Sequence, residues 1–274
     1  MGNGIDYSAV QRYFELAGAG SSSAASYMAH DQNLPAAAIR YRFAVELKTI
    51  GDWLDAVPAD GAVLDVGCGA GAWTALFAQR FGRVIGIEGS ESMVTAAKDR
   101  TQDLENVEIL QGDVRQDLPD GPFALVFLGG LCMYLNDDDV VTLLTSLKER
   151  CRPDAAIVLR ESTVPERSRQ AEGEYQAVYR TVAEYQQLFR RVGFSDVQLR
   201  RNLGYTSMEI AIELVEMRRR WLPFLPASSQ WLGALTWWPL RLTAPLSFRR
   251  LPRALDRLNV PWPGLQNHFF RLSV

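Results

Sequence analysis

The sequence has few residues that form disulfides or bind transition metals. It contains three cysteines and two histidines among 274 residues. Cys68, Cys132 and Cys151 lack the paired spacing of a disulfide framework, which favours a reducing compartment. His30 and His268 lie far apart in the chain, so we expect no zinc or iron centre.

Long apolar runs are also missing. No stretch approaches the roughly 18 uninterrupted apolar residues that a transmembrane helix needs. The first ten residues, MGNGIDYSAV, have no basic region followed by an apolar run, so we expect no signal peptide. The net charge of -3 provides no global field that attracts nucleic acid. These features predict a cytoplasmic protein that does not bind nucleic acid.

What the sequence does contain is an alternation of short apolar runs with helical segments between about residues 59 and 202. Such an alternation predicts parallel strands buried on both faces, with helices on both sides of a doubly wound α/β sheet. The predicted strands are Ala62–Val66, Val84–Ile87, Val107–Leu110, Phe123–Leu128 and Ala156–Leu159. The predicted helices are Trp73–Phe81, Ser92–Arg100, Asp138–Cys151 and Val182–Val192.

The segments on either side of this core have a different character. Residues 1–58 show helical spacing and predict an N-terminal cap. Residues 203–265 are rich in tryptophan and arginine and predict a helical insert. The composition of this insert is compatible with a membrane-surface platform, a lid over a bulky apolar substrate, or an ordinary helical layer. Residues 266–274 resemble a final strand.

Three alternate glycines, Gly67, Gly69 and Gly71, link the first predicted strand to its helix, and Asp65 stands two residues before them. Glycine allows the backbone to approach a ligand closely, and the helix start offers backbone N–H groups to a carboxylate or phosphate. Asp65 is placed to face a cationic group. The same glycines also fit a dinucleotide-binding pattern, so this loop alone does not distinguish the two cofactors.

Two further acids follow the next two predicted strands. Glu88 closes the second strand, where a carboxylate can accept both hydroxyls of a ribose. Asp113 follows the third strand, and we expect it to meet an adenine amine, with the backbone N–H of Val114 on the ring. Acids at three successive strand ends make the combination specific for a nucleoside.

These residues resemble the motifs of the class I S-adenosylmethionine (SAM) methyltransferases. The acid-x-Gly-x-Gly-x-Gly loop, the ribose-binding acid and the adenine-side acid of that family correspond to residues already named. The fourth strand departs from the family pattern, because Ala124 stands where an aspartate is common. The resemblance implies a seven-stranded sheet in which Asn267–Ser273 pairs antiparallel beside Ser195–Arg201. It also implies SAM as cofactor, with further contacts from Cys68, Gly89, Met93, Leu128 and Gly129.

The resemblance implies transfer of a methyl group from SAM to a small molecule by in-line displacement. Such an acceptor can be bulky, apolar or lipid-like if residues 203–265 form part of its site or contact a membrane surface. We expect the pocket beyond the carboxyl ends of the strands, with Glu161, Tyr134 and His30 as catalytic candidates. The candidates for contact with the acceptor are Tyr13, Tyr27, Gly130, Met133 and Arg180.

Two other functions fit parts of the sequence. One is a nicotinamide-dependent oxidoreductase on the same sheet, against which stand Asp65 and the lack of a Tyr-x-x-x-Lys pair. The other is a SAM-binding protein that does not transfer the methyl group.

Overall fold

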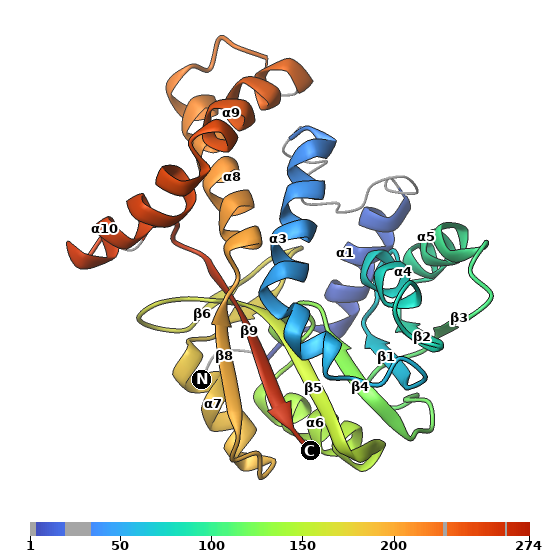
Figure 1. The fold of residues 1–274 in the computed structure, drawn as a ribbon. Coiled ribbons are helices and arrows are strands. Elements are labelled where there is room, and N and C mark those ends of the chain that lie inside the picture. Colours follow the sequence, from blue (N-terminus) through green and yellow to red (C-terminus); the bar gives the residue numbers. More distant parts are fainter. Residues whose placement is uncertain (1–3, 20–33, 227–228, 261) are drawn as a thin grey trace.

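The computed structural model describes residues 4–19, 34–226, 229–260 and 262–274. In this part of the chain one seven-stranded sheet, in the order β3-β2-β1-β4-β5-β9-β8, carries helices on both faces (Figure 1). Strand β9 runs antiparallel to its neighbours β5 and β8, and the other neighbours pair in parallel. The predicted doubly wound, mostly parallel sheet is therefore confirmed, including the antiparallel final strand.

The strands follow the apolar runs of the sequence. Their bounds are β1 Ala62–Val66, β2 Arg83–Glu88, β3 Val107–Gln111, β4 Phe123–Leu128, β5 Cys151–Thr163, β8 Val197–Arg201 and β9 Gln266–Ser273. Strand β5 is much longer than its apolar run, and Cys151, predicted to end a helix, begins this strand. The extra length brings Arg160 and Glu161 into the sheet, where they pair with Phe269 and His268 of β9.

The helices that cover the sheet are α3 Ala36–Asp55, α4 Ala72–Ala78, α5 Glu91–Thr101, α6 Asp137–Glu149 and α7 Val182–Arg191, and α1 Tyr7–Ala19 lies beside α5. A short 3-10 turn, η1 Cys132–Tyr134, precedes α6. The three aspartates 137–139 fill the first turn of α6, where the helix dipole favours negative charge.

Alternation along the strands divides the core into two layers. On one face, Val63, Leu125 and Phe127 pack with Trp53 of α3 and Phe77 of α4. The residues between them along the strands face α6 and α7, whose side chains complete the other layer. Because successive side chains of a strand point to opposite faces, this parity also decides which polar residues at the strand ends face the same side.

A two-stranded hairpin, β6 Arg169–Ala171 and β7 Ala177–Tyr179, follows β5 and was not predicted. Strands of three residues are too short to show the alternation or the apolar run by which a strand is recognised. Their chain segment brings Tyr175 and Tyr179 beside Tyr134 of η1. The hairpin therefore contributes a wall to the pocket described below.

Beyond β8 the chain forms helices α8 Leu203–Trp221, α9 Gln230–Leu242, the π-helical turn η2 Leu246–Arg250 and α10 Leu251–Arg257, which extend away from the sheet (Figure 1). Asn202 caps α8 by accepting the backbone N–H of Tyr205 at 3.0 Å. At Gly204, α8 touches α3 so closely that a Cβ would lie 2.6 Å from the Arg42 carbonyl oxygen. Among the described residues, no helix has both the length and the apolar character needed to cross a bilayer.

Candidate cofactor and acceptor site

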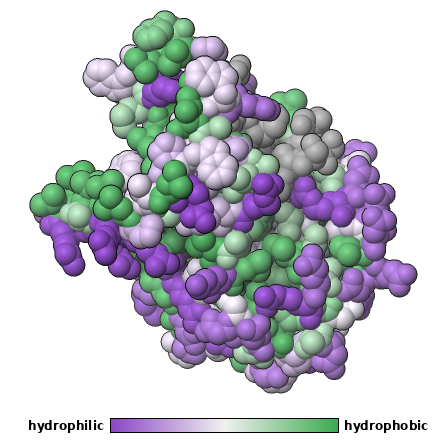
Figure 2. Space-filling view, turned by 45° about the horizontal axis from the view of Figure 1, so that its top comes forward, coloured by the Kyte–Doolittle hydropathy of each residue, from purple (hydrophilic) through white to green (hydrophobic). Residues whose placement is uncertain are grey.

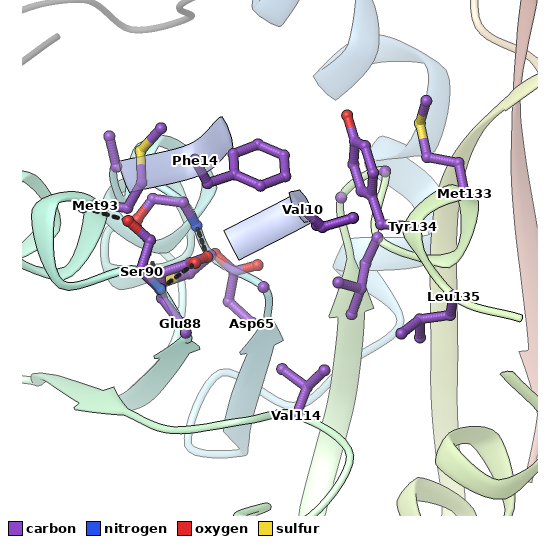
Figure 3. A pocket seen from close by; sticks show the side chains of 18 of the residues that line it. Val10, Phe14, Asp65, Glu88, Ser90, Met93, Val114, Met133, Tyr134 and Leu135 are labelled. Carbon is purple, nitrogen blue, oxygen red and sulfur yellow. Dashed lines mark hydrogen bonds between the residues drawn. The ribbon is translucent and has the colours of Figure 1, made fainter. Parts of the chain in front are cut away.

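A pocket of about 580 Å³ opens at the carboxyl ends of the parallel strands. Figure 3 shows Asp65, Glu88 and Met93 at one end and Tyr134 and Met133 at the other, with side chains of α1 between them. The first group lies at the ends of β1 and β2 and in α5, and the second lies in the 3-10 turn η1, after β4. The pocket thus has two halves, which we call the β1–β3 half and the aromatic half.

The glycine loop shapes the floor of the β1–β3 half. Gly67, Gly69 and Gly71 have φ angles of 67°, 53° and 73°, a region that disfavours side chains. A Cβ on Gly69 would meet no atom within 4 Å, whereas one on Gly71 would press on Ala97 at 3.1 Å. Gly69 therefore faces open pocket, which leaves room for a ligand directly against the backbone.

Glu88 closes β2 at the edge of this loop. Its carboxylate accepts the N–H of Gly69 at 2.9 Å and the N–H of Ser90 at 3.0 Å. Burial nevertheless raises the pKa of Glu88. Each carboxylate oxygen retains lone-pair capacity for a further donor, as the two hydroxyls of a ribose require.

Asp65 lines the same half from β1 but is almost completely buried. The Thr74 hydroxyl donates a 2.6 Å hydrogen bond to it, and burial raises its pKa to about 7. A carboxyl group of this kind is half protonated near neutral pH, and a neighbouring cation would favour its charged form.

Asp113 lies after β3 and lines the pocket together with Val114. The Arg115 guanidinium holds its carboxylate, with a shortest distance of 2.6 Å, and lowers the pKa of Asp113. The same guanidinium lies 3.9 Å from the centre of the Tyr7 ring. Arg115 thereby links this strand end to α1, a contact that the sequence did not reveal.

Most backbone N–H groups of the glycine loop already have partners. Those of Gly67 and Cys68 donate to the Ile87 carbonyl, that of Gly69 donates to Glu88, and that of Gly71 donates to the Cys68 carbonyl. Within the loop itself, few backbone N–H groups are therefore left for a ligand carboxylate.

Two buried arginines that line the pocket offer side-chain donors. Arg42 of α3 and Arg160 of β5 line the pocket, and both are more than nine-tenths buried. One fully buried carboxylate, Glu46, lies 3.4 Å from Arg42 and 3.6 Å from Arg160. Glu46 also accepts a 2.7 Å hydrogen bond from Asn202. Two guanidiniums thus share one neighbouring carboxylate beside the pocket, which favours an anion there.

The aromatic half is lined by Phe14, Met133, Tyr134, Tyr175 and Tyr179. Their hydroxyls form a chain, with Tyr134 to Tyr175 at 3.2 Å and Tyr175 to Tyr179 at 3.1 Å. Burial raises the pKa of Tyr179, so at neutral pH this hydroxyl remains protonated. This half therefore offers apolar surface with a few hydroxyl groups.

Two charged residues predicted for the acceptor site, Glu161 and Arg180, lie outside the lining of the pocket. Glu161 is fully buried on the α6–α7 face, where it accepts the Cys132 N–H at 3.0 Å and the Tyr185 hydroxyl at 3.2 Å. Arg180 donates to the Cys132 and Leu135 carbonyls at 2.7 and 2.6 Å and pairs with Asp137. Both side chains hold η1 in place instead of facing an acceptor.

The remaining predicted residues divide in the same way. Cys68, Gly89, Met93, Gly129 and Gly130 line the pocket. The pocket is not lined by Leu128, which is fully buried in the core, by Tyr13, which packs edge-on against Tyr175, or by Gly71, which lies against Ala97. Tyr27 and His30 lie outside the described residues.

Burial raises the pKa of the Cys68 thiol strongly, and the nearby carboxylates of Asp65 and Glu88 raise it further.

The sequence does not single out Arg42, and for Arg160, which directly follows the fifth predicted strand, it favours a solvated or cofactor-side charge. The alternation of β5 would have placed Arg160 on the face of Val158, opposite Glu161, had the full length of the strand been recognised. For Arg42, Tyr175 and Tyr179 the sequence carries no comparable signal, because their positions depend on how α3 and the hairpin pack.

This arrangement of sheet and glycine loop defines a Rossmann-like methyltransferase fold, and comparison with known proteins agrees. Residues 63–154 match a family model described as a methyltransferase domain. Trans-aconitate 2-methyltransferase of Azoarcus sp. (strain BH72) is 37% identical over 112 residues, which are 39% of this chain and 42% of that protein. Demethylmenaquinone methyltransferase of Bacillus licheniformis is 30% identical over 115 residues, which are 40% of this chain and 48% of that protein.

The fold itself extends further than the sequence matches. A SAM-dependent methyltransferase from Leishmania major superposes with a TM-score of 0.56 at 19% identity, covering 70% of this chain and 76% of that one. The chain spans less than half the length of the two curated relatives just described. The matched segment, residues 63–154, resembles the methyltransferase domain of the class I SAM-dependent methyltransferases, whose methyl donor is SAM. This assignment favours methyl transfer over nicotinamide-dependent oxidation.

Proposed function

We propose that this protein transfers the methyl group of SAM to a small molecule with an apolar or aromatic body. The observation that carries the proposal is the open space against Gly69, bordered by Glu88 on the neighbouring strand end. The pocket continues from there into the aromatic half without leaving the same cavity.

The residues of the β1–β3 half fit the parts of SAM. Glu88 would accept the ribose hydroxyls, and Asp113 with Val114 would border the adenine. Asp65 would face the amino group, since a cation there favours its charged form. The carboxylate would lie toward Arg42, because most loop amides already have partners. Bound in this way, SAM supplies a methyl group on an electrophilic sulfonium.

The protein's own contribution is alignment and exclusion of water. Holding two reactants in line lowers a barrier by roughly 7–11 kcal/mol in favourable cases. The wall formed by Phe14, Met133 and the three tyrosines favours a bulky, apolar acceptor, and the Tyr134 hydroxyl would orient its polar group. The guanidinium of Arg160 would attract a negative charge on the acceptor, because it shares Glu46 with Arg42.

The test uses the intact protein. Calorimetry should show binding of S-adenosylhomocysteine (SAH) and none of NADH. Turnover is measured with SAM carrying a labelled methyl group and a panel of small aromatic and apolar acids and phenols. Label in an organic-soluble product supports the proposal. Binding without turnover on any acceptor would instead support the alternative of a SAM-binding protein that does not transfer the methyl group.

A further inference from the structure

The segment 217–260, which we call the arm, collects most of the exposed apolar side chains of the described chain. The described chain has fourteen large hydrophobic residues that are exposed. Twelve of them lie in the arm, and the other two are Leu16 and Leu199. Figure 2 shows apolar side chains gathered on the protruding parts of the molecule, with charged side chains beside them. Exposed apolar patches of this kind mark interaction surfaces.

Helix α9 is apolar on two opposite sides. One side packs against α3 and α8 through Trp237 and Leu240, and Trp237 is completely buried. The opposite stripe consists of Trp231, Leu235, Trp238 and Leu242, which follow one another at helical spacing and are 58, 60, 50 and 82% exposed. A helix that is apolar on all sides is expected in a buried or membrane environment. The apolar composition of the outer stripe of α9 therefore indicates that a partner covers it, and no segment of the described chain does so.

Charge on the arm identifies the kind of partner. The arm contains eight arginines and one acidic residue, whereas the other 230 residues contain 21 basic and 31 acidic side chains. In η2 and α10, the arginines 249, 250, 253 and 257 are exposed, and Leu251 and Leu258 are exposed at neighbouring positions of the same segment. Tryptophan and leucine beside arginine on short helices are typical of segments that lie in the interface of a bilayer with anionic lipids.

We propose that the arm docks this protein on the surface of an anionic lipid bilayer, with the outer stripe of α9 and the side chains of Leu251 and Leu258 inserted between headgroups. The arginines would then contact lipid phosphates. A second copy of the chain fits the arm less well than a bilayer does. Its surface would have to be apolar opposite the outer stripe of α9 and acidic opposite the arginines. The inference depends on the arm alone and does not require the proposed acceptor.

Cosedimentation with vesicles tests the inference. Vesicles of phosphatidylcholine alone are compared with vesicles containing about 25% phosphatidylglycerol, at about 0.1 M salt, where the Debye length is about 10 Å. We expect about tenfold or stronger partitioning onto the anionic vesicles, weakened by added salt. Equal binding to both vesicle types, or binding to neither, would overturn the proposal.

Two variants locate the contact. Leu235→Gln/Leu242→Gln removes the outer stripe, and its matched control, Leu199→Gln, changes an exposed leucine of β8. The second variant replaces the arginines 249, 250, 253 and 257 by glutamine, and its control replaces the exposed arginines 12, 40, 167 and 190. We expect each arm variant to lose about tenfold or more in partitioning and each control to bind like the parent protein.

Unchanged SAH binding and thermal unfolding show that a variant has folded. If one arm variant fails to fold, the other still decides the question. Light scattering measures the oligomeric state and tests the alternative that the outer stripe is a subunit interface. A dimer that Leu235→Gln/Leu242→Gln converts to a monomer, together with absent vesicle binding, would identify the stripe as a subunit interface and refute the proposal.

Discussion

The carboxylate of Glu88 accepts the backbone N–H of Gly69 at 2.9 Å, across a separation of nineteen residues in the chain. The bond joins the end of β2 to the loop that follows β1, so the two motifs are built as one unit before any ligand binds. Replacing Glu88 by alanine removes this contact and the proposed ribose acceptor together. We expect SAH affinity to fall about ten- to one-hundredfold, since hydrogen bonds to charged groups contribute about 1.5–3 kcal/mol. Calorimetry measures this change.

Gly69→Val should abolish SAH binding while the protein remains folded. The new side chain would enter the open space of the pocket, where no protein atom lies within 4 Å, so the clash arises only with the ligand. The positive φ adds strain of about 1–3 kcal/mol. Gly173→Val is the matched control, because Gly173 also has a positive φ and open surroundings but does not line the pocket. Retained micromolar affinity in Gly69→Val would contradict the placement.

Affinity for SAH should rise with pH because of Asp65. Its pKa of about 7 means that the carboxyl is largely protonated at about pH 6, and the cationic amino group of the ligand favours the charged form. Binding therefore expels a proton below neutrality. We expect about tenfold weaker binding at about pH 6 than at about pH 8. In Asp65→Asn affinity should be weaker and nearly independent of pH, and a slope equal to that of the parent protein would assign the titration to another group.

Arg42→Met tests the donor proposed for the cofactor carboxylate. The variant should bind SAH about ten- to one-hundredfold more weakly. Its affinity for 5′-methylthioadenosine, which lacks the amino-acid carboxylate, should stay near that of the parent protein. Equal losses for both ligands would indicate a general disturbance of the pocket, because Arg42 also lies near Glu46 and Tyr205.

Arg180→Met should lower stability by about 2–4 kcal/mol. The substitution leaves the carbonyls of Cys132 and Leu135 without this buried donor and removes the pair with Asp137. Urea unfolding measures the loss, with the exposed Arg190→Met as control. A variant as stable as the parent protein but with altered acceptor kinetics would return Arg180 to the role predicted from the sequence.

Much of the β1–β3 half could be predicted because its signals are local in sequence. The glycine loop and the acids Asp65, Glu88 and Asp113 each stand at a strand end, and in a parallel sheet these ends meet at one edge. The aromatic half was predicted only through Gly130, Met133 and Tyr134, which directly follow β4.

The sequence alone therefore determined the sheet, the order of its motifs and the kind of cofactor. Apolar runs, glycines and acids at strand ends are signals that each span only a few residues. The tertiary structure decided which charged side chains face the pocket. Glu161 and Arg160 are neighbours in sequence, yet strand parity sends the first to η1 and the second to Glu46 on α3. The position of Arg42 and the exposed stripe of α9 likewise depend on which faces the helices bury, and this follows from packing between distant segments.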